Sequence, residues 1–67
     1  MRTEIVRAKD VQVGDWINVD GVEFAPVRQR EETDAGVEFR CAAWGVDELV
    51  TVIRRNGEAI LCGRGNV

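Results

Sequence analysis

The chain has 67 residues, of which 45% are hydrophobic and 31% charged, so it is long enough for one folded domain and too apolar to be disordered. Its formal net charge of −3 argues against tight binding to a phosphate backbone through a broad basic surface, although a local basic patch is not excluded. A chain this short buries only about 60% of the surface that its unfolded form exposes, which leaves little core from which to build a substrate pocket. These numbers exclude a multidomain chain and argue against an enzyme.

Short runs rich in Val, Ile and Phe alternate with glycine-containing turns along the whole chain. Strands are predicted over residues 3–8, 16–19, 22–30, 37–44, 49–55 and 58–62. Asp20-Gly21 and Asn56-Gly57 fit a two-residue type I′ turn, which needs positive φ, and residues 31–36 are predicted to form an open hairpin loop. This order predicts an all-β fold, a small five- or six-stranded antiparallel SH3-like barrel that forms a single domain over residues 1–67.

Alternation along these strands separates the core from the surface. Trp16 and Trp44 are predicted to face outward, because the neighbouring positions of the same strands carry the apolar residues of the core. The predicted inward set is Ile17, Val19, Val37, Phe39, Cys41 and Ala43, with Val11 and Val13 tucked under the sheet. In the third strand, Phe24 and Val27 both look like core residues but differ in parity, so we expect a bulge or bend near Ala25-Pro26.

The last two predicted strands carry apolar residues on both faces, at positions 49, 50, 52 and 53 and again at 59–62. A strand that is apolar on both faces is normally covered on both faces, and a barrel of this size has only one interior. Either the N-terminal segment or another chain would cover the second face. We therefore expect a protein partner or a second copy of this chain in a homodimer.

The residues that commonly carry chemistry are scarce. With no histidine and no serine, the chain does not fit the hydrolase templates that pair a nucleophile with a histidine base. Cys41 and Cys62 supply only half of a zinc site, so we expect no metal, no cofactor and no catalytic residue, with an intermolecular zinc or disulfide as the alternative. Without an apolar leader or a run of about 20 apolar residues, the chain is predicted to be cytoplasmic, with reduced thiols and no membrane contact.

Two sets of surface residues are candidates for binding. The first is a basic stripe across adjacent strands with Trp44 as a stacking platform for nucleic acid, made of Arg28, Arg40, Arg54 and Arg55. The alternative is that these arginines only keep the strand edges soluble. The second set is Trp16 and Trp44 as anchors of a protein interface, where tryptophan is enriched, although a register slip of one residue would return either to the core. Protein interaction is the leading hypothesis, and nucleic-acid binding is the alternative.

Residues 11–21 read V-Q-V-G-D-W-I-N-V-D-G and are followed by Phe24 and Val27. This stretch resembles the V-x-x-G-D-x-I-x-V-x-G opening of small β-barrels such as Hint (intein and hedgehog-type) modules and the KOW-like domain of translation elongation factor P. The resemblance implies a tight turn, a strand and then a hairpin, and it implies no common function. As a whole the chain is similar to small SH3-like hypothetical proteins of actinobacteria and their phages built on the same G-D-x-I-x-x-D-G plan, which implies an accessory role.

Overall fold

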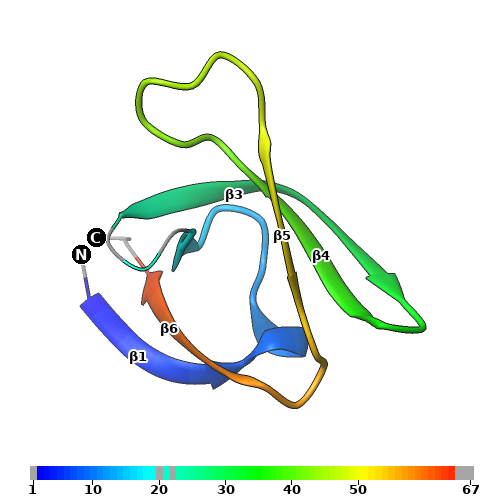
Figure 1. Cartoon of the computed structure of the whole chain (residues 1–67). Helices are drawn as coiled ribbons and strands as arrows, with labels where there is room; N and C mark the ends of the chain where they lie inside the picture. The colour runs from blue at the N-terminus through cyan, green and yellow to red at the C-terminus, as the bar shows by residue number, and fades with distance from the viewer. Residues whose placement is uncertain (1, 20, 22, 65–67) are drawn as a thin grey trace.

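The structure is a computed structural model, and it describes residues 2–19, 21 and 23–64. Six strands form one antiparallel sheet in the order β1-β6-β2-β3-β4-β5 (Figure 1). The strands are β1 (Arg2–Arg7), β2 (Trp16–Asn18), β3 (Phe24–Thr33), β4 (Gly36–Cys41), β5 (Val50–Arg54) and β6 (Ala59–Arg64), and a short 3-10 turn, η1 (Ala8–Asp10), follows β1. The predicted all-β class is confirmed, and each predicted strand overlaps an observed one.

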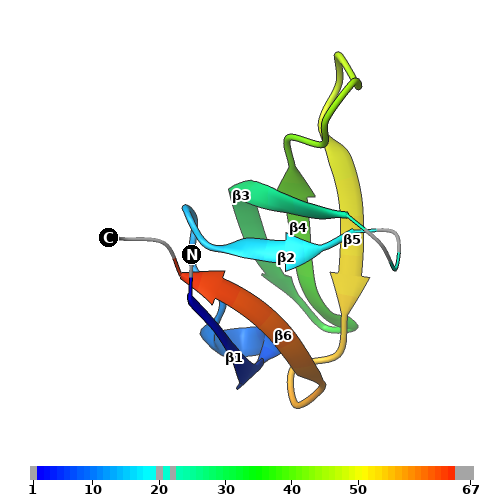
Figure 2. The ribbon, with the colours of Figure 1, turned by 90° about the vertical axis from the view of Figure 1, so that its left-hand side faces the viewer.

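The long strand β3 links the two halves of the sheet. Its first residues, Phe24 to Pro26, pair with β2, and from Val27 onward it pairs with β4. The sheet therefore coils around its inner face, with β1, β6 and β2 on one side and β4 and β5 on the other (Figure 2). Its two edge strands, β1 and β5, are not paired with each other, so the hydrogen-bonded sheet stays open between them.

The core lies on the inner face of this sheet. Its largest fully buried side chain is Phe39, and the rest of the core is formed by Ala8, Val11, Ile17, Ala25, Val27, Val37, Cys41, Val52, Ile60 and Cys62. The predicted inward face of β4 is confirmed, and Val19 and Ala43 pack against the core as half-buried residues. Val13 was predicted to be covered but is 56% exposed, because it lies in the tight turn closed by a hydrogen bond from Asp15 N–H to Gln12 O.

The predicted bulge in β3 exists, but it lies farther along the strand. Val27 is opposite Cys41 and Gln29 is opposite Arg40, so Arg28 is the extra residue. Proline is tolerated at position 26 because the side of β3 to which its N–H would point has no strand partner there: β4 has already ended at Cys41. The Pro26 carbonyl still accepts a hydrogen bond from the Ala42 N–H, at 3.1 Å. Ala25 and Val27 therefore share the inner face, and Phe24 is only half-buried on the other side.

Two of the three predicted turns differ from expectation. Residues 31–33 continue β3 instead of forming a loop, because the hairpin closes tightly between Thr33 and Gly36, and the Thr33 hydroxyl accepts the Ala35 N–H at 3.2 Å. Asn56-Gly57 is a turn closed by Glu58 N–H to Arg55 O, but neither residue has positive φ, so the type I′ prediction is wrong. The physical reason is that β5 and β6 do not pair, so no primed hairpin turn is needed. Asp20 lies outside the described residues, while Gly21 has the positive φ that the turn prediction requires.

Candidate interaction surface

The outer face of the β1–β6–β2–β3 half carries a group of apolar side chains that the register brings together. Ile5 lies opposite Leu61, and Trp16 lies opposite both Gly63 of β6 and Pro26 of β3. Directly opposite residues on antiparallel strands point to the same face of the sheet, and diagonal neighbours remain within reach of a large side chain. We call Ile5, Trp16, Phe24, Pro26 and Leu61 the outer apolar face.

Exposure distinguishes this surface from the core. Ile5 is 68% exposed, Leu61 43% and Trp16 39%, whereas Val6, Ile17, Ile60 and Cys62, the neighbouring apolar residues of the inner face, are buried or half-buried. Figure 2 shows the four strands that carry these residues side by side. The N-terminal segment does not cover β6, contrary to one of the two expectations, because β1 pairs beside β6 and adds Ile5 to the exposed surface.

Trp44 lies in the loop between β4 and β5, which projects from the body of the fold (Figure 1). Its side chain is 88% exposed, and its backbone N–H donates to a carboxylate oxygen of Glu23 at 3.0 Å, which fixes this end of the loop beside the start of β3. Val46 and Leu49 of the same loop are 50% and 41% exposed. Both tryptophans are thus exposed, Trp16 by strand alternation and Trp44 because β4 ends at Cys41, before the predicted end of the strand at residue 44.

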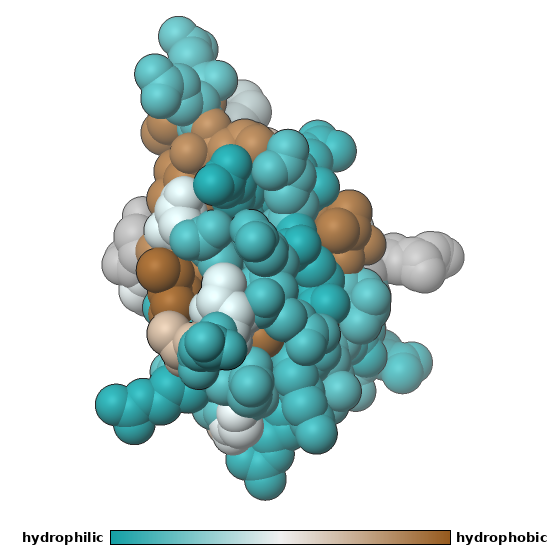
Figure 3. All heavy atoms as spheres, turned by 90° about the vertical axis from the view of Figure 1, so that its right-hand side faces the viewer, coloured by the Kyte–Doolittle hydropathy of each residue, from teal (hydrophilic) through white to brown (hydrophobic). Residues whose placement is uncertain are grey.

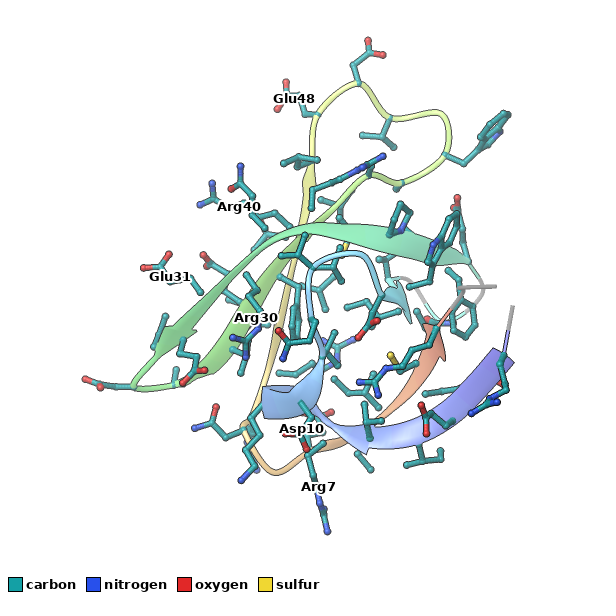
Figure 4. All side chains as sticks on the ribbon, turned by 180° about the vertical axis from the view of Figure 1, so that it is seen from behind. Arg7, Asp10, Arg30, Glu31, Arg40 and Glu48 are labelled. Carbon is teal, nitrogen blue, oxygen red and sulfur yellow. The ribbon has the colours of Figure 1, made fainter. Side chains whose placement is uncertain are left out.

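The four predicted binding arginines fall into two separate places. Arg40 lies opposite Gln29, next to the bulge residue Arg28. Arg40 Nη2 lies 3.7 Å from Glu38 Oε1, and Glu31 lies opposite Glu38. Figure 4 shows Arg40 and Glu31 directed away from the sheet, and Figure 3 shows this side of the molecule as mostly hydrophilic. Basic and acidic groups are therefore interleaved here.

The other two arginines lie at the far end of β5. Arg54 is opposite Val37, and its Nε lies 3.9 Å from Glu58 Oε2, while Arg55 is exposed in the turn that follows. Because Arg54 takes the inner-face parity and Arg40 the outer one, the four arginines do not form one continuous stripe. Trp44 belongs to neither pair.

The two thiols are buried. Burial raises the pKa of both Cys41 and Cys62, and the nearby Asp15 carboxylate raises the pKa of Cys62 further, against a lowering contribution from Arg64. Only the deprotonated thiolate acts as a nucleophile or metal ligand, and a raised pKa keeps both thiols protonated at neutral pH. Both side chains are therefore suited to packing in the core.

Sequence reasoning missed a polar cluster beside Cys62. Arg64 Nε lies 3.3 Å from Asp15 Oδ2 and Arg64 Nη1 lies 3.3 Å from Glu4 Oε2, while Nη2 donates to Asp10 O at 3.1 Å. Arg64 thereby joins β1, η1, the start of β2 and the end of β6. Arg30 also joins two distant segments of the chain: it points from β3 toward η1 and donates a hydrogen bond to Lys9 O at 2.9 Å (Figure 4). No local sequence signal marks either contact, since the partners lie far away in the chain.

Within the part of the chain that the structure describes, no three His, Cys, Asp or Glu residues are grouped so that they could hold a metal ion. Across those same residues, no helix has the length and apolar character needed to cross a membrane. No protein-family model, no curated protein and no solved structure matches this chain. The resemblance carried by residues 11–21 therefore stays a prediction.

Proposed function

We propose that this protein is a non-catalytic protein-interaction module and that the outer apolar face is its binding surface. The observation that carries the proposal is a group of apolar side chains from four strands, Ile5, Leu61, Trp16, Pro26 and Phe24, on a face that the described residues leave exposed or half-exposed. The half-buried Asn18 shares this face, between Leu61 and Phe24. Contiguous exposed apolar patches on small soluble domains commonly mark interaction sites, and tryptophan is enriched among the residues that dominate binding energy.

The border of this face fits the anatomy of an interface. Arg7, opposite Ala59, and Thr3, opposite Gly63, lie on the same side of the sheet as Ile5 and Leu61 and are exposed. An apolar centre with a polar border is the arrangement that protein partners bury. The partner would present apolar side chains to Ile5, Trp16 and Leu61, with an acceptor or carboxylate near Arg7.

Nucleic-acid binding is the weaker proposal. Arg40 and Arg54 each have a carboxylate within 4 Å, and Glu31 lies opposite Glu38, which forms the ion pair with Arg40. Phosphate binding depends on a concentrated positive surface and weakens steeply with salt. A filter-binding or fluorescence-polarisation titration with single- and double-stranded DNA and RNA at low salt would reveal any such binding, and a flat titration would end this alternative.

We also propose that the coiled sheet is a variant of the SH3-like barrel. Two features support this: β3 is shared between both halves, and η1, which follows β1, is joined to the turn between β5 and β6 by hydrogen bonds from Ala8 N–H to Glu58 O at 2.9 Å and from Lys9 N–H to Asn56 O at 3.2 Å. An experimental structure in which these two hydrogen bonds are replaced by water would contradict the assignment. The free, buried thiols are compatible with the proposed cytoplasmic location.

The interaction role is testable with paired surface variants. Leu61→Lys places a charge in the middle of the outer apolar face, and Gln29→Lys places the same charge on the exposed polar side of β3. Tagged wild type and Gln29→Lys are expected to capture the same protein from cells of the source organism, and Leu61→Lys is expected to lose it while keeping its circular-dichroism spectrum. Equal capture by Leu61→Lys would refute the assignment of this face.

A further inference from the structure

The strand β5 is an unprotected edge of the sheet. It pairs with β4 on one side, no strand among the described residues pairs with its other side, and Figure 2 shows it at one border of the fold. Edge strands usually carry charges, a proline or a bulge that prevent them from pairing with another chain. The other edge strand, β1, carries Arg2, Glu4 and Arg7, whereas residues 49–53 contain no charge and no proline.

The hydrogen-bond pattern identifies the backbone groups at this edge. The Ala42 N–H donates to Pro26 O, so the even-numbered positions of β4 point toward β3 and the odd-numbered ones toward β5. The partners of these odd positions on β5 are Val50, Val52 and Arg54, opposite Cys41, Phe39 and Val37. The N–H and C=O groups of Thr51 and Ile53 therefore point to the open side.

The side chains at this edge also suit pairing. Thr51 is exposed and Ile53 is 54% exposed, and both are β-branched residues that favour strands. The Ile53 carbonyl accepts a hydrogen bond from Arg54 Nη1 at 2.9 Å, which leaves its second lone pair for another donor.

We propose that two copies of this chain associate through their β5 edges, antiparallel, so that the sheet continues across the dimer. With Val52 on the two-fold axis, Thr51 of each copy pairs with Ile53 of the other, and their outward N–H and C=O groups exchange hydrogen bonds.

The charge pattern around β5 favours a second copy over a foreign strand. Asp47 and Glu48 precede the uncharged segment, and Arg54 and Arg55 end it. Antiparallel self-pairing about Val52 places the acidic end of one copy next to the basic end of the other, twice by symmetry. In this register Leu49 is opposite Arg55 and Glu48 is opposite Asn56 of the second copy, so the opposite charges lie at adjoining ends and not as directly opposite residues. Parallel pairing would place like charges together. Figure 4 shows Glu48 directed away from the body of the protein, and Arg55 is exposed in the turn beyond β5.

This dimer is independent of the outer apolar face. The outer apolar face belongs to β1, β6, β2 and the start of β3, whereas the dimer uses the far edge of the sheet. Each copy therefore keeps its outer apolar face available to a partner, and the two proposals can fail separately.

Sedimentation equilibrium of the full chain, from low to high micromolar concentration, tests the proposal. The wild type is expected to show a monomer–dimer equilibrium. Thr51→Pro removes an edge N–H that β4 does not use, and Ile53→Lys adds a charge at the edge, so each is expected to weaken the dimer about tenfold or more. Gln29→Lys and Leu61→Lys, which place a lysine elsewhere on the surface, are expected to leave the dissociation constant unchanged.

A charge exchange gives the second readout. Glu48→Arg is expected to weaken the dimer several-fold, because the attraction between the acidic end of each copy and the basic end of the other is lost, and adding Arg55→Glu is expected to restore part of it. Circular dichroism of each variant confirms that it is folded. A strictly monomeric wild type at high micromolar concentration would overturn the proposal. So would a dimer that is lost in Leu61→Lys but kept in Ile53→Lys, or a double variant that shows no recovery.

Discussion

Gly36, the first residue of β4, occupies a place where the neighbouring strand leaves no room for a side chain. It is buried and has φ +144°, a backbone conformation that L residues rarely adopt. A Cβ atom at this position would lie 2.2 Å from the carbonyl oxygen of Arg54 and 3.0 Å from Arg55 Cα. Both are backbone atoms, so Gly36→Ala requires the hairpin and β5 to move apart.

The expected cost of Gly36→Ala combines two effects. Holding a non-glycine residue in such a conformation costs about 1–3 kcal/mol. Ordinary contacts between non-bonded heavy atoms begin near about 3.5 Å, so the Arg54 carbonyl must also shift by about 1 Å, at the expense of β4–β5 pairing. A loss of about 3 kcal/mol in the free energy of unfolding follows. That is a large share of the roughly 3–10 kcal/mol expected for a domain of this length.

The chain contains a matched control. Gly57 lies in the exposed turn before β6, has no positive φ, and a Cβ there would meet no atom within 4 Å. Gly57→Ala is therefore expected to be neutral or to stabilise by about 0.4–1 kcal/mol, through reduced entropy of the unfolded chain. Urea unfolding followed by tryptophan fluorescence and circular dichroism measures both. If the free energies of unfolding of Gly36→Ala and Gly57→Ala differ by less than about 0.5 kcal/mol, the packing described at Gly36 is wrong.

Three further predictions concern single side chains. Phe39→Ala is expected to lower the free energy of unfolding by about 3–5 kcal/mol, because the ring is fully buried, and a urea midpoint close to that of wild type would refute this. Trp44→Ala is expected to change that energy by less than about 0.5 kcal/mol, and it should remove most of the iodide-quenchable fluorescence; retained quenching would mean that Trp16 is the more exposed ring. Burial raises the pKa of Cys41 and Cys62 above the ordinary 9.0, so their contribution to stability is complete below that pH and is lost as the pH rises through the folded-state pKa. Urea midpoints measured between neutral pH and pH 10 should therefore fall at the alkaline end, and an equal fall in Cys41→Ala/Cys62→Ala would assign it to other groups.

Local sequence patterns predicted the strands because strand alternation and glycine turns are local signals. The inward set Val37, Phe39 and Cys41 and the outward position of Trp16 follow from parity, and the structure agrees with them, whereas Trp44 is exposed because β4 ends at Cys41 and Trp44 lies in the following loop. The sequence predicts the bulge at Ala25-Pro26, but it lies at Arg28. Pro26 itself needs no bulge, because β4 has already ended beside it.

Local sequence signals could not predict which distant strands pair with each other. Asn56-Gly57 has the composition of a primed hairpin turn, but the strands on either side of it pair with β4 and with β1 and β2, not with each other. The outer apolar face depends on the same pairing, since Ile5 and Leu61 are 56 positions apart and meet only because β6 lies between β1 and β2. Parity gives no signal for Ile5, because each face of β1 carries two polar residues and one large apolar residue, Ile5 on one face and Val6 on the other.

In the two proposals made above, the excess of apolar residues between positions 49 and 62 supplies two surfaces with different requirements. Leu61 belongs to a sheet face, where a partner is held by side-chain packing and a single charge is disruptive. Ile53 lies at a strand edge, where a partner is held by backbone hydrogen bonds and a missing N–H is disruptive. Because these surfaces do not share a strand, the effects of Leu61→Lys and Ile53→Lys on self-association and on partner capture should be separable. One shared effect on both assays would instead mean that a single continuous interface covers the face and the edge together.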